Sequence, residues 1–480
     1  MTKQEAVIKY IEDNYLQFKR LRHDVVSDKL QIRLSGEEAM RLLGERYEYW
    51  REMTKHDINS IVCHSAQECD VNITSREVMT ALQSDLIPDV HPLREYILSL
   101  PPFTPDQPDW IDWVASQVKV RDSAQDRPAG CRSAQVPVDG RSAAPVVFHN
   151  ESPASNASEL QCSASETNYS EATHSSQRER SEADRLWRGC FKKWFVAMVA
   201  SWMKDEVVNH QVLVLIGKQG IYKTTWLEHL IPPHLRAYAC KLANSNDLNK
   251  DERLRIAEFG LISLDEIDSM NSRELNQLKS IITATDVNER AAYAYTKERR
   301  VRLASFCASG NRRDFLTDIT GNRRWLPFEV ESIQSPFTTI LPYERMYAQA
   351  WALAQDPFFS YWFDLDEIEV LEQHNQHFRD ESNEEQLLAI LFDIPAEGRG
   401  EFMTTAQISE RLVTYGNIKK PMALSRLGMV LGKAGFRAVT RNAGSGRARG
   451  WIVYQRDSDE IKSLRRLLKD ETSQLDTAIY

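Results

Sequence analysis

The chain has 480 residues, enough for two to four domains with buried cores. Its 60 lysines and arginines are outnumbered by 69 aspartates and glutamates, and the net charge of −9 excludes binding of nucleic acid through global basic charge, so any DNA contact must come from local patches. The seven cysteines are scattered without a Cys-x-x-Cys pair, which favours reduced thiols in a cytoplasmic protein over a disulfide framework or a metal site. No apolar run approaches ~20 residues, so we expect no membrane-spanning helix and no membrane partner.

Residues 1–117 are expected to form a mostly helical N-terminal region. Apolar residues from Ile8 to Phe18 recur at helical spacing, and a short strand pair is expected within 25–34. We find no acidic triad with a partner histidine, which favours a helical docking or collar domain without chemistry. Residues 118–184 are rich in Ser, Ala, Pro and Gln and poor in apolar clusters, which predicts a disordered linker that tethers this region loosely.

Residues 185–360 are expected to form the central domain, which opens with a helix rich in aromatic residues. Trp187, Trp194 and Trp202 recur with other apolar residues at helical spacing, so we expect this helix to pack under a β-sheet. Stacking of these tryptophans on nucleic-acid bases is the alternative.

A strand, a glycine-containing loop and a helix start follow one another in the central domain. Five aliphatic residues at 212–216 predict a buried strand, and a helix-like pattern begins near Lys223. Backbone N–H groups of such a loop bind phosphate oxygens, so the arrangement predicts a P-loop for ATP with Mg²⁺. Lys223 is expected to contact the β- and γ-phosphates, and Thr224 to hold the metal. The predicted nucleotide-binding residues are Gly217, Lys218, Gln219, Gly220, Ile221, Tyr222, Lys223, Thr224 and Thr225.

Tyr222 departs from the usual G-x-x-x-x-G-K-[ST] pattern, because it stands where the second glycine belongs. A tyrosine adopts a positive φ only at a cost, and Gly220 two residues earlier could supply part of the needed freedom. The alternative for this stretch is a buried strand followed by a turn that carries a lysine.

Carboxylates and an amide follow two later strand-like runs. Asp265 and Glu266 end the first run, where Asp265 is expected to hold Mg²⁺ and Glu266 to polarise the attacking water. A solvated acidic helix start is the alternative for this pair. Asn311 ends the second run, within Ser-Gly-Asn, and is expected to sense the γ-phosphate or orient the water.

Arg323 and Arg324 follow a glycine turn further along the chain. Paired arginines of this kind can act as arginine fingers, which stabilise transition-state charge, often from a neighbouring subunit. The alternative is a surface pair bound to Asp314 or Asp318.

The order of these motifs resembles that of the virulence-associated E family, whose members are P-loop ATPases related to superfamily-three helicases and to phage and plasmid primase-helicases. The family's glycine before the P-loop lysine is replaced here by Tyr222. In superfamily-three relatives a basic hairpin grips single-stranded DNA in the ring pore, and the resemblance implies this role for Lys297, with a solvated hairpin face as the alternative. The resemblance covers Trp187–Val330 strongly and rests on Gly217–Thr224, Asp265-Glu266, Lys279 to Asp286, Ser309-Gly310-Asn311 and Thr320–Trp325.

After residue 360 we expect a helical connector at 361–383, a small domain at 384–456 and a charged tail at 457–480. Three helical patterns followed by two strand patterns around 442–446 predict a winged helix. A protein-docking winged helix is the alternative. The residues expected to contact the phosphates of duplex DNA are Lys419, Lys420, Arg426, Arg447 and Arg449.

Together these features predict an α/β fold: a P-loop, AAA+-like ATPase core with a helical N-terminal region, a disordered linker and a C-terminal winged-helix domain. The predicted function is that of an ATP hydrolase, a superfamily-three-like DNA helicase or translocase that serves replication or mobilisation of a mobile element. We expect a homo-oligomer, with a hexamer among the options. The alternatives are a nucleotide-gated DNA-binding switch or initiator that does not unwind, and a non-catalytic adaptor.

Overall fold

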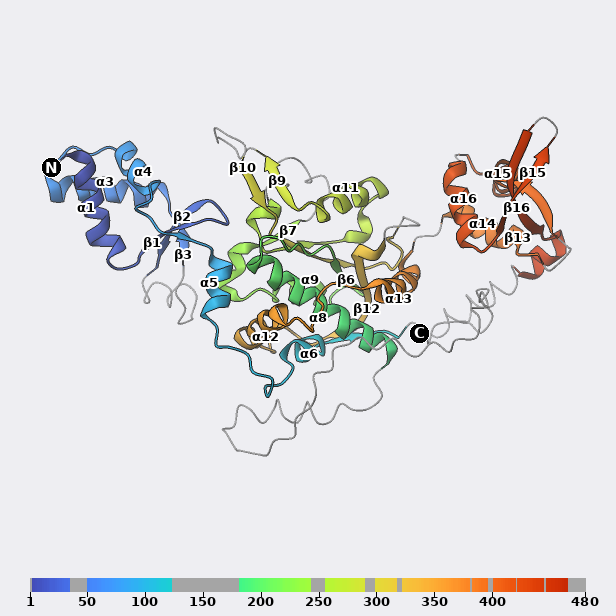
Figure 1. Ribbon diagram of the computed structural model, residues 1–480, viewed down its shortest axis with the longest axis horizontal. Helices are drawn as coiled ribbons and strands as arrows, with labels where there is room; N and C mark the ends of the chain where they lie inside the picture. The colour runs from blue at the N-terminus through green and yellow to red at the C-terminus, as the bar shows by residue number, and fades with distance from the viewer. Residues whose placement is uncertain are drawn as a thin grey trace. The chain divides into compact units, whose positions relative to one another are not determined.

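The computed structural model is a mixed α/β protein whose residues group into two compact units (Figure 1). The first unit holds residues 1–121, 147–313 and 323–371, and the second holds 122–146, 314–322 and 372–480. Lys297, Lys420 and most of the expected linker and tail lie outside the described residues. The structure describes residues 2–34, 50–122, 181–242, 255–289, 298–316, 322–379, 382–395, 400–419, 421–443 and 446–464.

A four-stranded sheet and helices form the N-terminal part of the first unit. The strands lie in the order β3-β2-β1-β4, and their buried apolar side chains pack on the three helices. A short strand pair was expected within 25–34, and β2 lies there with its antiparallel partner β1 just before it. Strands β3 and β4 were not expected, because they have only three and two residues. The elements are α1 (Lys3–Ile11), β1 (Leu21–Asp24), β2 (Lys29–Arg33), β3 (Trp50–Glu52), α3 (Lys55–Cys69), α4 (Ser75–Leu82) and β4 (Asp89–Val90).

The segment from 92 to 120 belongs to the core of the central sheet. It contains α5 (Pro92–Ser99), α6 (Trp110–Ala115) and β5 (Val118–Val120), and its apolar side chains are buried in the same cluster as the aromatic helix. The prediction of a disordered linker at 118–184 is therefore wrong for its first residues, because β5 pairs antiparallel with a strand of the central sheet. Loose tethering is wrong for this segment too, since its apolar residues are part of the shared core.

A six-stranded sheet in the order β5-β12-β6-β11-β8-β7 forms the centre of the first unit. All its neighbouring strands are parallel except β5 with β12, so the carboxyl ends of the five parallel strands meet at one edge. Strands β6, β8 and β11 are buried along their whole length, as expected of parallel strands covered on both faces. The parallel strands are β6 (Val212–Ile216), β7 (Ala239–Leu242), β8 (Leu261–Leu264), β11 (Ser305–Gly310) and β12 (Trp325–Ile333).

The aromatic helix α8 (Glu182–Met203) packs against this sheet, with α6 and α12 (Tyr343–Gln355) beside it (Figure 1). Trp187, Trp194 and Trp202 are fully buried, and each indole N–H donates to a backbone carbonyl at 2.9–3.1 Å. The packing prediction is confirmed, and base stacking by these tryptophans is excluded because solvent cannot reach them. None of the helices among the described residues is long and apolar enough to cross a bilayer.

The remaining elements of the first unit flank the sheet. They are α9 (Lys223–Glu228), α11 (Ser272–Ile282), the antiparallel pair β9 (Asp286–Glu289) and β10 (Glu298–Val301), and α13 (Leu365–Asn375), which ends beyond the unit. Lys297 was expected on a basic hairpin, and the antiparallel strands β9 and β10 flank it in the sequence, but their connection at 290–297 lies outside the described residues.

In the second unit, helices α14, α15 and α16 and short strands surround one apolar core. Strand β16 pairs with β13, β14 and β15, all antiparallel, and Trp451 and Val453 on β16 pack on Ile408 and Leu427 of the helices. The three helices and the hairpin lie where the sequence predicted them. The elements are α14 (Asn383–Leu391), β13 (Phe392–Asp393), β14 (Glu401–Thr404), α15 (Thr405–Gly416), α16 (Leu424–Lys433), β15 (Arg437–Ala443) and β16 (Gly446–Gln455).

A buried ion pair joins α8 to α13. Lys193 Nζ donates to both carboxylate oxygens of Glu367, at 2.6 and 2.7 Å, and the two side chains are 5% and 6% exposed. A buried charge that loses its partner is strongly destabilising, whereas replacing both partners by apolar residues is often nearly neutral.

We predict that Lys193→Met lowers the free energy of unfolding by about 3–5 kcal/mol and that the double variant Lys193→Met/Glu367→Leu recovers most of the loss. Urea unfolding followed by tryptophan fluorescence measures this in the first unit, because Trp451 alone of the eleven tryptophans lies outside it. Lys119→Met is the control, since Lys119 forms an exposed ion pair with Glu331. Equal losses in Lys193→Met and Lys119→Met would contradict the prediction.

Candidate functional site

The loop between β6 and α9 has tight backbone geometry. A Cβ at Gly217 would lie 2.6 Å from the carbonyl oxygen of Val330, so this position requires glycine. Gly220 has a φ of 86° and Tyr222 a φ of 67°, which places both in the left-handed region. Tyr222 therefore adopts the conformation that a glycine would adopt freely, at a cost of roughly 1–2 kcal/mol.

Lys223 lies beneath this loop and links it to the end of β11. Its ammonium donates to the carbonyls of Gly217 and Lys218, both at 2.7 Å, and to Asn311 Oδ1 at 3.2 Å. Burial lowers the pKa of Lys223 below its usual value. The structure thus brings together Lys223 and Asn311, which lie 88 residues apart in the sequence.

A cluster of oxygen atoms lies beside the lysine, where three strands end. Asp265 Oδ1 accepts from Ser309 Oγ at 2.7 Å and from Thr224 Oγ1 at 3.1 Å, and the two hydroxyls lie 2.9 Å apart. Lys241 on β7 forms an ion pair with the other carboxylate oxygen of Asp265 at 2.8 Å. Burial alone would raise the pKa of Asp265, but hydrogen bonds from Lys241 and Ser309 outweigh burial and lower it. Asp265 is therefore held as a carboxylate.

This cluster suits a hard divalent cation that keeps part of its own ligand shell. One carboxylate and two hydroxyls are oxygen ligands of the kind Mg²⁺ prefers, but they are few. Among the described residues, no group of three or more His, Cys, Asp or Glu side chains could hold a metal. A cation bound by Thr224 and Asp265 would therefore take its remaining ligands from water or from phosphate oxygens.

Asp268 follows β8 and connects this segment to the end of β11, where Asn311 lies. Its Oδ1 accepts from the backbone N–H of Asn311 at 3.1 Å, and Arg312 donates to its backbone carbonyl at 2.6 Å. A Cβ at Gly310 would lie 2.9 Å from this carboxylate, so glycine permits the approach. Glu266 precedes this turn, is exposed and has a φ of 52°.

Three residues of this arrangement were not singled out from the sequence. Ser309 was part of a quoted motif without a role, and its contact with Asp265 depends on the register of β11 with β8. Lys241 lies on a four-residue strand that carries little apolar signal. Asp268 follows the Asp-Glu pair closely, and its spacing from that pair was the only available signal.

Arg323 and Arg324 lie at the opposite edge of the sheet. They immediately precede β12, whose first residue Trp325 pairs with Val212 at the amino end of β6. Burial lowers the pKa of His210, near the same strand end, and the charges of Arg324 and Arg323 lower it further. A five-residue strand spans roughly 16 Å, so these arginines do not join the cluster around Lys223 within one chain. Asp318, one alternative partner, lies outside the described residues.

The structure positions the other predicted residues as follows. Gln219 and Ile221 complete the loop, and Thr225 follows Thr224 in α9. In the second unit, Arg447 and Arg449 are exposed on β16, Lys419 is exposed after α15, and Arg426 is half-buried on α16.

The match to one family model agrees with the resemblance drawn from the motifs. Residues 170–386 match the model of the virulence-associated protein E-like domain. No curated protein matches the chain. Among solved structures, an apo structure of the NrS-1 C-terminal region is similar at 10% identity and a TM-score of 0.43, with 94% of this chain and 100% of that chain covered. Two A-form apo structures of the same region have TM-scores of 0.40 and 0.39, at 10% and 11% identity, and cover 92% and 93% of this chain and 98% and 99% of theirs.

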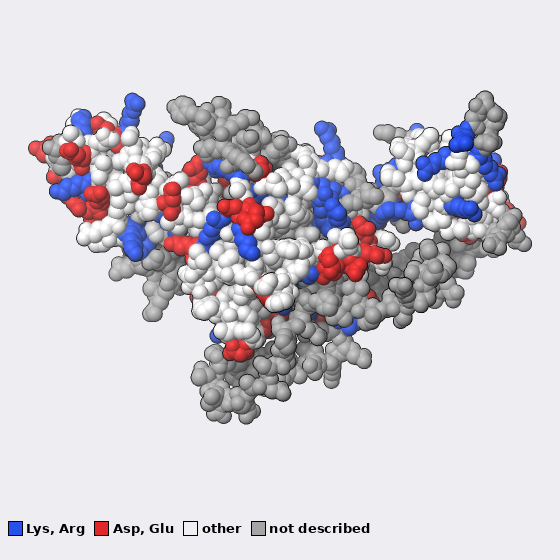
Figure 2. Space-filling model, in the orientation of Figure 1, with Lys and Arg blue, Asp and Glu red and all other residues white. Residues whose placement is uncertain are grey.

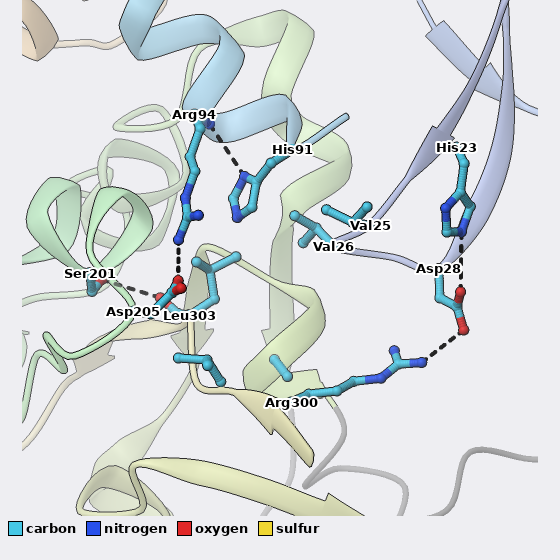
Figure 3. A pocket seen from close by; sticks show the side chains of 12 residues that line it. His23, Val25, Val26, Asp28, His91, Arg94, Ser201, Asp205, Arg300 and Leu303 are labelled. Atoms are coloured by element: carbon cyan, nitrogen blue, oxygen red, sulfur yellow. Dashed lines mark hydrogen bonds and ion pairs between the residues drawn. The ribbon is translucent and has the colours of Figure 1, made fainter. Parts of the chain in front are cut away.

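A cavity of about 280 Å³ lies elsewhere in the first unit, between the β1–β2 turn, α5, the end of α8 and β10 (Figure 3). Its charged side chains are paired with one another: Arg94 with Asp205, and Arg300 with Asp28 at 2.8 Å. None of the predicted site residues lines it. Because the charged side chains of this cavity pair within the protein, we assign the cavity a structural role between the N-terminal four-stranded sheet and the central six-stranded sheet.

His91 lines this cavity and caps the start of α5. Its Nδ1 accepts the backbone N–H of Arg94 at 3.3 Å, which requires a neutral ring. Burial, with a smaller contribution from the charge of Arg94, lowers the pKa of His91 to about 4. Between pH 4 and the ordinary value near 6.5, the unfolded chain binds a proton that the folded protein does not, so stability falls as the pH falls through this window.

We predict that His91→Asn, which keeps a capping acceptor but does not titrate, reduces this acid sensitivity. Between pH 7 and pH 5 the wild type should lose about 2 kcal/mol more unfolding free energy than the variant. Urea unfolding at both pH values, followed by tryptophan fluorescence, measures the difference. Parallel losses in the two proteins would show that His91 does not contribute.

Proposed function

We propose that this protein is an Mg²⁺-dependent ATP hydrolase with a P-loop, AAA+-like core, and that it acts on DNA as a superfamily-three-like helicase or translocase. The observation that carries the proposal is the meeting of Lys223, Thr224, Asp265 and Asn311 at one edge of a parallel sheet. The similarity of residues 170–386 to the virulence-associated protein E-like domain supports it. Service in replication or mobilisation of a phage, plasmid or integrative element is part of the same proposal.

The residues at this edge divide the hydrolytic chemistry among them. The loop N–H groups and Lys223 would hold the β- and γ-phosphates, and Lys223 would exchange its two loop carbonyls for phosphate oxygens. Bound Mg²⁺, held by Thr224 and Asp265, would supply neutralisation of phosphate charge. Glu266 would polarise the attacking water, and Asn311, held by Asp268, would orient it or contact the γ-phosphate.

The remote position of Arg323 and Arg324 bears on assembly. Since they lie at the amino edge of the sheet, they could stabilise transition-state charge only in the site of another copy. A head-to-tail homo-oligomer would place the amino edge of one copy against the carboxyl edge of the next, and such a contact closes into a ring when the rotation permits. A ring, with a hexamer among the options, is therefore part of the proposal.

The second unit is proposed to bind duplex DNA as a winged helix. Helices α14, α15 and α16 followed by the β15–β16 hairpin have the chain order of that fold, with α16 as the recognition helix. Lysine and arginine side chains gather on the visible face of this unit (Figure 2). Four arginines are exposed along the hairpin: Arg437, Arg441, Arg447 and Arg449. The last two lie on the same face of β16, because they are two residues apart. The β9–β10 hairpin of the first unit is proposed to contact single-stranded DNA.

A nucleotide-gated DNA-binding switch that does not unwind is the second candidate. Two observations favour it: Tyr222 replaces the loop glycine, and Lys223 is hydrogen-bonded to the carbonyls of its own loop. A strand-displacement assay separates the two functions, since the switch would bind ATP and DNA without separating the strands. Phosphate release with and without single-stranded DNA would identify a non-catalytic adaptor, which would release none.

We predict that Lys223→Ala abolishes ATP turnover and weakens ATP binding, whereas Glu266→Gln abolishes turnover with ATP binding retained. Removal of the general base lowers the rate by at least ~10²-fold without removing a phosphate contact. Lys29→Ala is the control, because Lys29 is exposed on β2 and pairs with Glu52 in the N-terminal sheet. Phosphate release and equilibrium ATP binding are measured with and without single-stranded DNA. Turnover that persists in Lys223→Ala would disprove the site.

We predict that Arg447→Ala/Arg449→Ala weakens binding of duplex DNA regardless of its sequence. Loss of two phosphate contacts should also reduce the slope of log affinity against log salt by about 2. Fluorescence anisotropy with a labelled duplex at several salt concentrations measures both effects. Lys462→Ala is the control, because Lys462 is exposed after β16 and paired with Asp459. An unchanged salt slope in the double variant would assign the hairpin to another partner.

A further inference from the structure

Two exposed aromatic rings lie beside the phosphate loop. Tyr222 is 42% exposed and Phe337 is 70% exposed, and their ring centroids are 6.1 Å apart at an interplanar angle of 80°. The His229 ring lies 5.7 Å from Phe337 in a similar edge-to-face geometry. The three rings thus contact one another as a cluster, and this cluster borders the proposed phosphate site.

The position of these rings relative to the sheet is fixed by strand order. Phe337 lies in the segment 334–342 that follows β12, and β12 neighbours β6 on the side away from β11. Asp265 and Ser309 lie on the other side, at the ends of β8 and β11. A nucleotide whose terminal phosphate and metal lie beside Asp265 would therefore extend its sugar and base towards β12 and Phe337.

The segment that carries Phe337 is held by its own hydrogen bonds. The backbone N–H groups of Thr338 and Thr339 donate to the carbonyl of Ser335 at 3.2 and 3.1 Å. Tyr343 Oη donates to the His229 carbonyl at 2.7 Å, which joins the following helix to the end of α9. The turn that bears Phe337 is thus held by its own hydrogen bonds, whereas both rings remain partly exposed to solvent.

We propose that Tyr222 and Phe337 form the stacking surface for the nucleobase of the bound nucleotide, with the base parallel to one ring and edge-on to the other, because the two rings are nearly perpendicular. This inference rests on the proposed ATP site and names the residues that contact the base. Stacking of a base on an aromatic side chain contributes about 1–3 kcal/mol and does not read the edge of the base. The site therefore favours purine over pyrimidine nucleotides, because purines offer the larger ring area, and it distinguishes ATP from GTP weakly. Tyr222, which replaces the loop glycine, has a strained positive φ, and in this proposal its ring contacts the base.

The test compares ligands that share phosphates but differ in the base. Calorimetric titration of the full chain with Mg-ATP, Mg-GTP, Mg-CTP and magnesium tripolyphosphate measures Kd for each. For Phe337→Ala we expect ATP affinity to fall about 5- to 150-fold, the equivalent of 1–3 kcal/mol, with tripolyphosphate affinity unchanged within about twofold. Tyr222→Phe, which keeps the ring, should bind ATP as the wild type does.

Tyr222→Gly separates the ring from the backbone. It restores the residue that tolerates a positive φ and removes the ring, so its ratio of ATP to tripolyphosphate affinity should fall although its loop is relaxed. Phe358→Ala is the matched control, because Phe358 belongs to the same unit, is 94% exposed and lies after α12, away from the loop.

The outcomes distinguish this inference from the function on which it rests. If Lys223→Ala weakens both ATP and tripolyphosphate but the ring variants change neither ratio, the stacking surface is disproved and the phosphate site stands. Proportional loss of ATP and tripolyphosphate in the ring variants also disproves it, and assigns the rings to loop structure. If Lys223→Ala changes neither ligand, the nucleotide site itself is wrong, and the base surface fails with it.

Discussion

Parallel pairing of β11 with both β6 and β8 is the constraint on which the candidate site depends. The pairing aligns the strand ends, so that Ser309 and Asp265 meet and the loop after Ile216 opens beside them. Side chains alternate along a strand, so a shift of one residue in either pairing would turn Ser309 to the other face and separate this cluster. The register of the sheet therefore determines which side chains meet at the site, more than the conformation of the loop does.

This sheet needs cover on both faces, because its inner strands are apolar throughout. The 22-residue α8 gives cover on one face, and each of its three buried indoles donates its N–H to a backbone carbonyl in the interior. One of those carbonyls belongs to Ala115, and this hydrogen bond adds to the apolar packing and the β5–β12 pairing that hold residues 92–120 in the same core.

The sequence predicted those elements whose signals are local and strong. Apolar runs identified β6, β8 and β11, and helical patterns identified α14, α15 and α16. Short strands with charged residues, such as β1 and β7, carry no comparable signal and form because their neighbours do. The roles of Ser309, Lys241 and Phe337 depend on register and strand order, which a single sequence does not encode locally. Motif residues could thus be named in advance, but the side chains that complete the site could not.

Backbone strain gives an independent reason to regard this edge as functional. Among the described residues, six that are not glycine have a positive φ, and three of those are Asp or Asn, which tolerate it. Of the other three, Tyr222 directly precedes Lys223 and Glu266 directly follows Asp265. Strain of this kind costs about 1–3 kcal/mol and persists where the surrounding structure imposes it, most often at ligand-binding and catalytic sites. Both strained residues flank the Thr224–Asp265–Ser309 cluster, so the backbone conformations that lower the stability of the fold lie where the proposed chemistry takes place.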